Sequence, residues 1–224
     1  MPPDQTISVI IPTLDEENNI DFVLSGLPHF IDEVIIVDGY SSDKTIERAK
    51  KYNPMILYDS LGKGSALRRG MNEAKGEIII LMDADCSHIS KEIPLLLAGI
   101  NAGYDICMGS RFIQGGGSED ITFIRKCGNK FFVWIVNLLW GMKYSDLCYG
   151  YRALRREVIP LLNLESNDFA IETEISIKAA KKKLKILEVP SFEKLRFRGS
   201  GKLKTLRDGV LVFRHIIREF FLRR

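Results

Sequence analysis

The sequence has few of the features that mark a disulfide scaffold, a zinc site or a membrane span. Its 224 residues include four cysteines, none in a C-x-x-C pair, so we expect free thiols and a reducing cytoplasm. No apolar run reaches the roughly 18 residues that a spanning helix needs, since the longest candidate covers only residues 131–140. Residues 1–6 are polar and show no signal-peptide pattern, which also favours a cytoplasmic location.

The charge is small overall but unevenly distributed. A net charge of +3 gives no reason to expect nucleic acid as a partner. From Lys178 onward the chain is basic, whereas carboxylates gather at residues 15–17 and 83–85. This asymmetry fits an anionic substrate or an anionic surface, and a solvated helix face is the alternative. The length suits one α/β domain, so we expect a single domain over residues 1–224.

Apolar segments alternate with helical patterns through the first half of the chain. Residues with β-branched side chains predict buried strands, and the polar stretches between them predict helices, with Ser41, Ser42 and Asp43 as candidate N-caps. The predicted strands are 7–11, 33–37, 55–58, 77–82 and 105–108, and the predicted helices are 16–27, 44–52, 64–74 and 90–101. Such alternation predicts a mostly parallel, Rossmann-like central sheet with helices on both faces.

The second half is less regular. We expect a mobile glycine-rich loop first, and then a mixture of helices and short strands. The loop covers residues 115–120, the helices 123–142, 167–183 and 203–223, and the strands 149–154 and 185–189. No internal repeat and no linker divides the chain.

Carboxylates follow three of the predicted strands. Because ligands bind at the carboxyl ends of parallel strands, we expect these side chains to share one edge of the sheet. They are Asp15 and Glu16, Asp38, and Asp83 with Asp85. Asp83 and Asp85, one residue apart after a buried strand, can converge on Mg²⁺ or Mn²⁺, and such an ion would bridge a diphosphate. The alternative is an exposed turn whose aspartates cap a helix.

Several short motifs, in their joint order, point to a known family. They are PTLDE (12–16), VDG (37–39), GKG (62–64), DAD (83–85), GSR (109–111), DLCYGYRALRREV (146–158), FAIETE (169–174) and R-x-x-G-x-x-K (196–202). In this order the sequence resembles family 2 glycosyltransferases of the GT-A fold. Within them it is most similar to dolichol-phosphate mannose synthases and related polyprenyl-phosphate glycosyltransferases. The resemblance covers nearly the whole chain.

The resemblance implies an inverting, metal-dependent hexosyltransferase. It would move mannose or glucose from a GDP- or UDP-sugar to a dolichyl or polyprenyl phosphate at the cytoplasmic face of the membrane, using Mg²⁺ or Mn²⁺. Residues 1–110 would bind the donor and residues 111–224 the acceptor. The implied donor-binding residues are Pro12, Leu14, Glu16, Asp38, Lys63, Asp83, Ala84, Arg196 and Lys202. The implied phosphate-binding residues on the acceptor side are Arg111, Arg125 and Asn129. The implied catalytic residues are Asp85, Asp146 and Glu172, and the implied metal ligands are Asp83, Asp85 and Ser87.

Some roles stay open at this level. Ser87 stands where the mannose synthases have Gln, which leaves the third metal ligand undecided. Glu174 either serves the site or pairs with Lys178 on one helix face. His88 is either a metal ligand or, as we expect of a lone histidine, a surface or capping group. The nucleotide and the sugar are also open.

Two segments suit a membrane surface. Residues 131–140 contain two tryptophans among apolar side chains, and residues 203–224 form a basic amphipathic pattern. We therefore expect a peripheral membrane protein, whereas packing into the core or a homodimer interface is the alternative. A membrane-anchoring subunit is a further partner that the sequence leaves open.

Three other functions compete with this interpretation. A glycosyltransferase acting on a soluble or glycan acceptor would need a carboxylate general base such as Asp146 or Glu172. A sugar-phosphate nucleotidyltransferase would carry a glycine-rich, arginine-containing loop after the first strand, which this sequence lacks. A non-catalytic nucleotide-binding subunit would not need Asp83 and Asp85.

Overall fold

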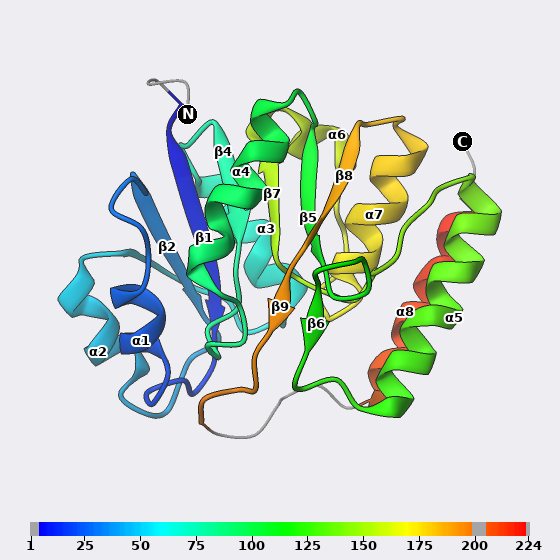
Figure 1. Cartoon of the computed structure of the whole chain (residues 1–224). Helices are drawn as coiled ribbons and strands as arrows, with labels where there is room; N and C mark the ends of the chain where they lie inside the picture. The colour runs from blue at the N-terminus through cyan, green and yellow to red at the C-terminus, as the bar shows by residue number, and fades with distance from the viewer. Residues whose placement is uncertain (1–4, 199–204, 223–224) are drawn as a thin grey trace.

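The computed structural model describes residues 5–198 and 205–222, which fold around a seven-stranded sheet (Figure 1). The strand order is β3-β2-β1-β4-β7-β5-β8. The strands are β1 (Ile7–Thr13), β2 (Glu33–Asp38), β3 (Met55–Tyr58), β4 (Ile78–Leu81), β5 (Ile106–Ser110), β7 (Arg152–Arg155) and β8 (Ile186–Pro190). β7 runs antiparallel between β4 and β5, and the other pairings in this sheet are parallel. The prediction of a mostly parallel sheet is therefore confirmed.

Helices cover both faces of the sheet, because the strands are apolar on both sides. In β1, Val9 and Ile11 pack with α1 and α4, whereas Ile10 packs on the opposite face with α3 and α7. The helices are α1 (Ile20–Ser25), α2 (Thr45–Ala49), α3 (Lys63–Glu73), α4 (Ile93–Asn101), α5 (Phe123–Trp140), α6 (Ile159–Leu162), α7 (Ile171–Lys181) and α8 (Thr205–Phe221). Short 3₁₀ turns are η1 (Lys50–Tyr52), η2 (Ser90–Glu92) and η3 (Arg156–Val158).

Two local predictions are wrong. The helix expected over 16–27 begins only at Ile20, because Asp15 has a left-handed φ of 52° and the backbone N–H of Glu16 is donated to the Thr45 hydroxyl. The loop expected over 115–120 contains a short strand, β6 (Gly117–Ser118), which pairs with β9 (Phe192–Glu193) in a separate two-stranded sheet.

The loop before α2 also differs from the prediction. Ser41 donates to Asp38, and Ser42 donates to Asp15, so neither serine caps the helix. Asp43 does accept the backbone N–H of Thr45, the first helical residue. The polar side chains of this loop therefore bind mainly to the loop that follows β1.

α5 and α8 lie side by side at one end of the molecule (Figure 1). Their inner faces form a third apolar cluster with α7, which includes Val136, Ile177, Val212 and Ile216. Their outer faces stay exposed, as described below. Because α8 packs mainly against α5 and α7, its position depends on these contacts.

Charged side chains also join α7 to α8. Glu174 is fully buried, lies 2.7 Å from Lys178, and accepts the backbone N–H groups of Glu165 and Ser166. Burial alone would raise the pKa of Glu174, but these hydrogen bonds outweigh it and hold the pKa below its ordinary value. Of the two interpretations of Glu174, the structure supports pairing with Lys178.

His215 of α8 lies beside this pair. Its Nε2 atom is 4.0 Å from Glu174 and 3.9 Å from Glu219, a spacing that would also allow a metal ion. The charge of the two carboxylates is already balanced, since Lys178 and Lys181 each lie within 2.8 Å of one of them. Burial lowers the pKa of His215, so the neutral imidazole is favoured in this cluster.

We predict that Glu174→Gln lowers the free energy of unfolding by about 3 kcal/mol, because it removes the nearest carboxylate, at 2.7 Å, from the buried Lys178 and leaves only Glu219, at 3.9 Å. Glu165→Gln is the matched control. It makes the same change in a pair with Arg218 whose side chains are 43% and 52% exposed, and we expect it to cost less than about 1 kcal/mol. Urea unfolding of both variants tests this prediction. Equal losses would contradict it.

Candidate active site

A cavity of about 900 Å³ opens at the carboxyl ends of the parallel strands. One part is polar and is lined by loops that follow β1, β3 and β4 and by the start of α3. The other part is apolar and runs between α5 and α8. Its apolar lining includes Ile121, Ile124, Phe131, Phe132, Leu206, Val210, Val212 and Phe213.

A first ion-pair cluster joins Lys63 to Asp83 and Glu172. The Lys63 ammonium lies 2.7 Å from Asp83 and 2.8 Å from Glu172, and all three side chains border the cavity. Burial would lower the pKa of Lys63, but the two carboxylates outweigh it and raise the pKa above its ordinary value. Lys63 in turn holds the pKa of Asp83 below its ordinary value, against the effect of burial. Lys63 and Asp83 therefore form a charged pair at pH 7.

The glycines beside Lys63 allow this placement. Gly62 has a φ of 127°, and a Cβ there would lie 2.4 Å from the carbonyl oxygen of Asn167. A Cβ on Gly64 would lie 2.5 Å from the carbonyl oxygen of Ser166. The start of α3 can thus press against the segment that leads to α7, which brings Lys63 to Glu172.

The second cluster, which we call the arginine bridge, joins Arg196 to Glu16 and Asp85. The guanidinium lies 2.7 Å from the Glu16 carboxylate and 3.1 Å from the Asp85 carboxylate. Burial raises the pKa of Glu16, although Arg196 and Asn19 oppose this effect. The bridge connects the loops after β1 and β4 to a segment that lies more than a hundred residues away along the chain.

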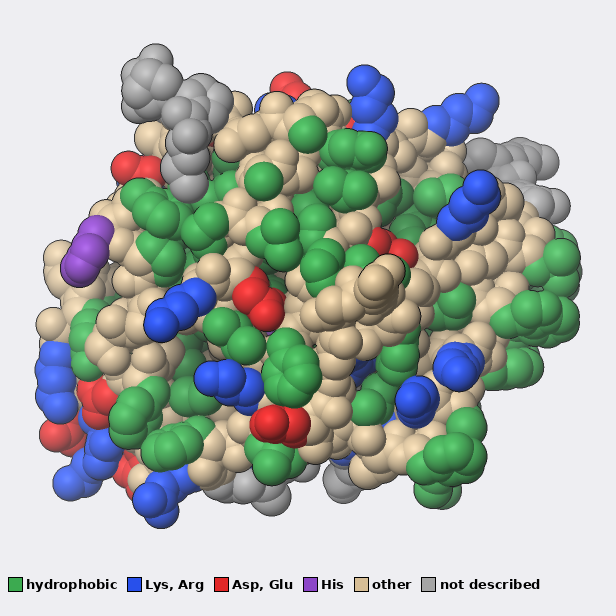
Figure 2. All heavy atoms as spheres, in the orientation of Figure 1, with side chains coloured by type: hydrophobic (Ala, Val, Ile, Leu, Met, Phe, Trp, Pro, Cys, Tyr) green, Lys and Arg blue, Asp and Glu red, His purple; other side chains and the backbone are tan. Residues whose placement is uncertain are grey.

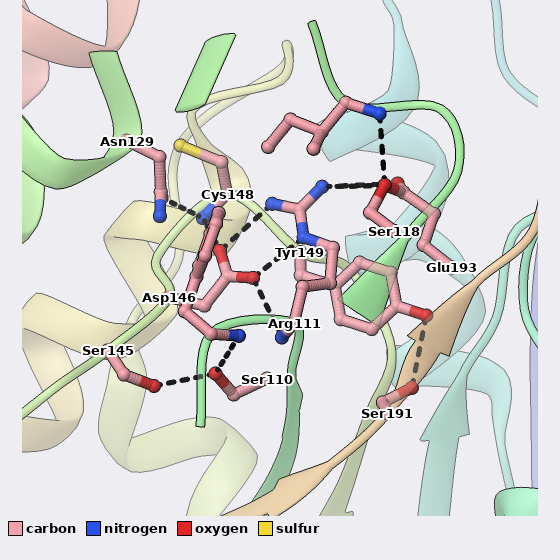
Figure 3. Close-up of polar contacts among 12 residues, drawn as sticks. Ser110, Arg111, Ser118, Asn129, Ser145, Asp146, Cys148, Tyr149, Ser191 and Glu193 are labelled. Carbon is pink, nitrogen blue, oxygen red and sulfur yellow. Dashed lines mark hydrogen bonds and ion pairs between the residues drawn. The ribbon is translucent and has the colours of Figure 1, made fainter. Parts of the chain in front are cut away.

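The third cluster joins Arg111 to Asp146 and Glu193 (Figure 3). Arg111 donates to both oxygens of Asp146, at 2.7 and 2.9 Å, and to both oxygens of Glu193, at 3.1 Å. Burial would lower the pKa of Arg111, but the two carboxylates raise it. The Asp146 carboxylate is fully buried, and the guanidinium also lies 4.8 Å from the ring centre of Tyr149.

The two other residues expected at the acceptor phosphate lie on α5. The Asn129 side-chain oxygen accepts the backbone N–H groups of Leu147 and Cys148. Its amide nitrogen is buried at the cavity and has no hydrogen-bond partner among the described residues. Arg125 also borders the cavity, where it donates to the Thr205 hydroxyl and lies 3.5 Å from Asp120.

The structure brings most of the remaining predicted residues to the cavity wall. These are Pro12, Leu14, Ala84 and Ser87. Asp38 does not line it: the side chain is 1% exposed and accepts hydrogen bonds from Thr13 and from Ser41. Lys202 lies outside the described residues.

His88 differs from its prediction as a surface or capping group. It is buried, accepts the backbone N–H of Asp83, and stacks on Tyr151 with ring centres 4.7 Å apart. Burial lowers the pKa of His88, so a neutral ring supports the loop that carries Asp83 and Asp85.

Some residues that line the cavity were not predicted from the sequence. Asp59 directly follows β3, so the rule that found Asp83 would have found it too. Glu193 and Phe169 also line the cavity. Phe169 opens the FAIETE motif but was given no role there, and Glu193 lies in none of the motifs.

The doubly covered, mostly parallel sheet has the GT-A fold of the glycosyltransferase structures that it matches, and its acidic cluster lies at the carboxyl edge of the strands. The chain belongs to glycosyl transferase family 2, whose family model matches residues 8–161.

Two curated relatives illustrate the similarity. The chain is 36% identical over 227 residues to a dolichol-phosphate mannosyltransferase of Pyrococcus furiosus, covering 95% of this chain and 63% of that protein. It therefore spans less than two thirds of that relative's length. It is 29% identical over 209 residues to a polyprenol monophosphomannose synthase of Mycolicibacterium smegmatis, covering 84% of this chain and 77% of that protein.

A solved structure shows the same fold. It is the glucosyl-3-phosphoglycerate synthase of Mycobacterium tuberculosis in complex with Mn²⁺, uridine diphosphate and phosphoglyceric acid. The two chains are 20% identical with a TM-score of 0.73, and the match covers 98% of this chain and 78% of that one.

The Arg111–Asp146 pair generates a prediction about Asp146. Asp146→Asn leaves Arg111 buried with one charged partner fewer, so we expect a loss of about 3 kcal/mol in the free energy of unfolding. Combining it with Arg111→Met should cost less than the sum of the two single changes, because the buried Asp146 carboxylate and the Arg111 guanidinium are then both absent. The loss of the Arg111 contact with Glu193 also occurs in the single Arg111→Met variant, so it cancels in the cycle. A urea double-mutant cycle measures this coupling. Full stability of Asp146→Asn with abolished turnover would instead support Asp146 as a catalytic base.

Proposed function

We propose that this protein transfers a hexose, with inversion, from a nucleotide-sugar to a polyprenyl or dolichyl phosphate at a membrane surface. The observation that carries the proposal is the single cavity in which an acidic strand edge continues into an apolar groove between α5 and α8. The names of the two curated relatives support the same substrate class. In this proposal residues 1–110 bind mainly the donor, and residues 111–224 bind mainly the acceptor.

The carboxylates after β4 fit a divalent cation. Asp83 and Asp85 both border the cavity, and their side chains are 28% and 18% exposed to it. Hard carboxylate oxygens suit Mg²⁺ or Mn²⁺. Ser87 also borders the cavity and is our candidate for the third ligand. A bound ion would neutralise charge on the departing diphosphate. Neighbours of the same fold were crystallised with Mn²⁺ or Mg²⁺ together with uridine diphosphate.

The donor nucleotide fits the polar part of the cavity. Pro12 and Leu14 line its wall, while Asp38 fixes the loop behind them rather than meeting the ligand directly. Asp59 provides a further carboxylate on this wall. Lys63 holds the carboxylates of Asp83 and Glu172 close together, and we propose that this positions them toward the sugar.

The structure favours a phosphate acceptor over a hydroxyl. A hydroxyl needs a general base, but Asp146 is fully buried against Arg111, and Glu172 is paired with Lys63. A phosphate monoester is already anionic at pH 7 and needs no strong base. The Asn129 side-chain nitrogen has no hydrogen-bond partner within the described part of the chain, and Arg125 lies one helical turn away, so both can donate to such a phosphate at the mouth of the apolar groove.

The outer faces of α5 and α8 fit a lipid surface. Hydrophobic side chains with basic side chains between them gather at this edge of the molecule (Figure 2). The most exposed are Phe123, Ile124, Trp134, Leu138, Leu206, Val210 and Phe221, which are 59–82% exposed. Three of them, Ile124, Leu206 and Val210, lie at the rim of the groove and also line it. Phe131 of α5 and Phe213 of α8 have ring centres 6.2 Å apart, so the two faces are continuous. Among the described residues, no helix is long and apolar enough to cross a bilayer.

These features support peripheral binding at a membrane surface, which we propose is the cytoplasmic face. Amphipathic helices with basic and aromatic residues lie in the interfacial region of a bilayer. A polyprenyl chain could bind in the apolar groove between two such helices and still remain next to the lipid.

A transfer assay tests the proposed function. The protein is incubated with Mn²⁺, polyprenyl phosphate and labelled GDP- or UDP-hexoses, and we expect label in the organic phase. Asp85→Ala should reduce transfer by at least about a hundredfold, since charge on the leaving diphosphate is then poorly stabilised. Label that reaches only water-soluble acceptors would contradict the proposal and favour a soluble-acceptor enzyme.

A vesicle assay tests membrane binding. We expect the protein to sediment with vesicles of acidic phospholipid and to be released by high salt. Trp134→Ser with Leu138→Ser should weaken binding by about tenfold or more, because both side chains would lose burial in lipid. Leu161→Ser, at an equally apolar residue of α6 that is 50% exposed, is the control and should have little effect. Binding that is the same for all variants would contradict the assignment of this face.

A further inference from the structure

Arg196 lies between two carboxylates of the active site, one of which is a candidate metal ligand. Its guanidinium spans two carboxylates from different loops, at 2.7 Å from Glu16 and 3.1 Å from Asp85. Asp85 is also one of the two aspartates that fit a divalent cation. Arg196 and that cation would therefore compete for the same carboxylate.

The segment that carries Arg196 is tied to the loop after β4. The backbone N–H of Lys194 is donated to the carbonyl of Ser87, and that of Phe197 to the carbonyl of Asp85. The carbonyl of Arg198 accepts a hydrogen bond from the Asn19 side chain. These contacts do not involve the guanidinium, so they can hold the segment in place while the side chain changes partner.

Both oxygens of the Asp85 carboxylate already have a partner. Its Oδ1 atom accepts the backbone N–H of Ser87, and its Oδ2 atom faces Arg196. A divalent ion on this carboxylate would repel the guanidinium at close range, in a partly buried site where screening is weak. Arg196 would then keep Glu16 as a partner and need a new anion.

We propose that Arg196 is an internal counter-ion of Asp85, and that a divalent cation and the donor diphosphate bind together by displacing it. The cation takes the Asp85 carboxylate, and the diphosphate takes the released guanidinium, which matches phosphate oxygens as a fork. This exchange makes binding of the metal alone weak and binding of the pair cooperative. This proposal rests on the metal site of the proposed function and adds to it a coupling between metal binding and donor binding.

Metal binding without turnover tests the exchange. Mn²⁺ binding to the full chain is measured by electron paramagnetic resonance without nucleotide, and uridine or guanosine diphosphate binding is then measured by calorimetry at fixed Mn²⁺. For Arg196→Gln we expect Mn²⁺ alone to bind about tenfold more tightly than to the wild type, and the diphosphate to bind about tenfold more weakly. Arg196→Lys keeps the charge but not the fork, and should give an intermediate Mn²⁺ affinity.

Arg198→Gln is the matched control. It removes the same charge from the same segment, but Arg198 is exposed and its guanidinium lies 5.5 Å from the ring centre of Phe197. We expect its Mn²⁺ affinity to stay within about twofold of the wild type, since general charge effects are screened. An unchanged or weaker Mn²⁺ affinity in Arg196→Gln, or an equal gain in Arg198→Gln, would overturn the proposal. The measurement needs no acceptor, so it remains decisive even if transfer to polyprenyl phosphate fails.

Discussion

The site depends on one constraint, which is that the carboxylates of Glu16, Asp83, Asp85 and Asp146, partly or fully buried at the carboxyl edge of the sheet, each need a cation nearby. Asp83 has Lys63, Asp85 and Glu16 share Arg196, and Asp146 has Arg111. Unpaired charges in partly buried positions would cost several kcal/mol each. The cations come from the start of α3, from the end of β5 and from the segment after β9. Two of them, Lys63 through Glu172 and Arg196 through Glu16 and Asp85, also join the two halves of the chain around the edge.

The arrangement of the sheet could be predicted from the sequence because it depends on local patterns. Apolar strands such as those around Ile10 and Ile80 alternate with helices, and this alone requires a parallel sheet covered on both faces. Two details could not be predicted. Asp15 adopts a left-handed conformation that delays α1, and Gly117 pairs with Phe192 across 75 residues to form a strand in an expected loop. Both depend on partners that are distant in the sequence.

Only part of the site could be predicted, because local patterns show where a strand ends but not which distant residues meet there. The rule that ligands meet the residues after parallel strands placed Asp83 and Asp85 on the cavity wall, but it also selected Asp38, whose carboxylate binds only its own loop and its neighbour. The position of a side chain relative to a strand end could be predicted, whereas its hydrogen-bond partner could not. The partners of Asp146 and Arg196 lie 35 and 180 residues away, and no spacing pattern identifies such contacts.

The proposed acceptor follows from how the two kinds of surface meet. The charged edge ends at Arg111 and Asn129, where the apolar groove between α5 and α8 begins, and the outer faces of the same helices are apolar and exposed. An acceptor with a phosphate on a long hydrocarbon chain matches this sequence of surfaces, because its charge reaches the donor while its chain remains beside lipid. A soluble acceptor would bind in the polar part of the cavity and would not contact the apolar groove. The exposed faces of α5 and α8 and the groove between them are thus explained by one ligand, which neither surface would identify alone.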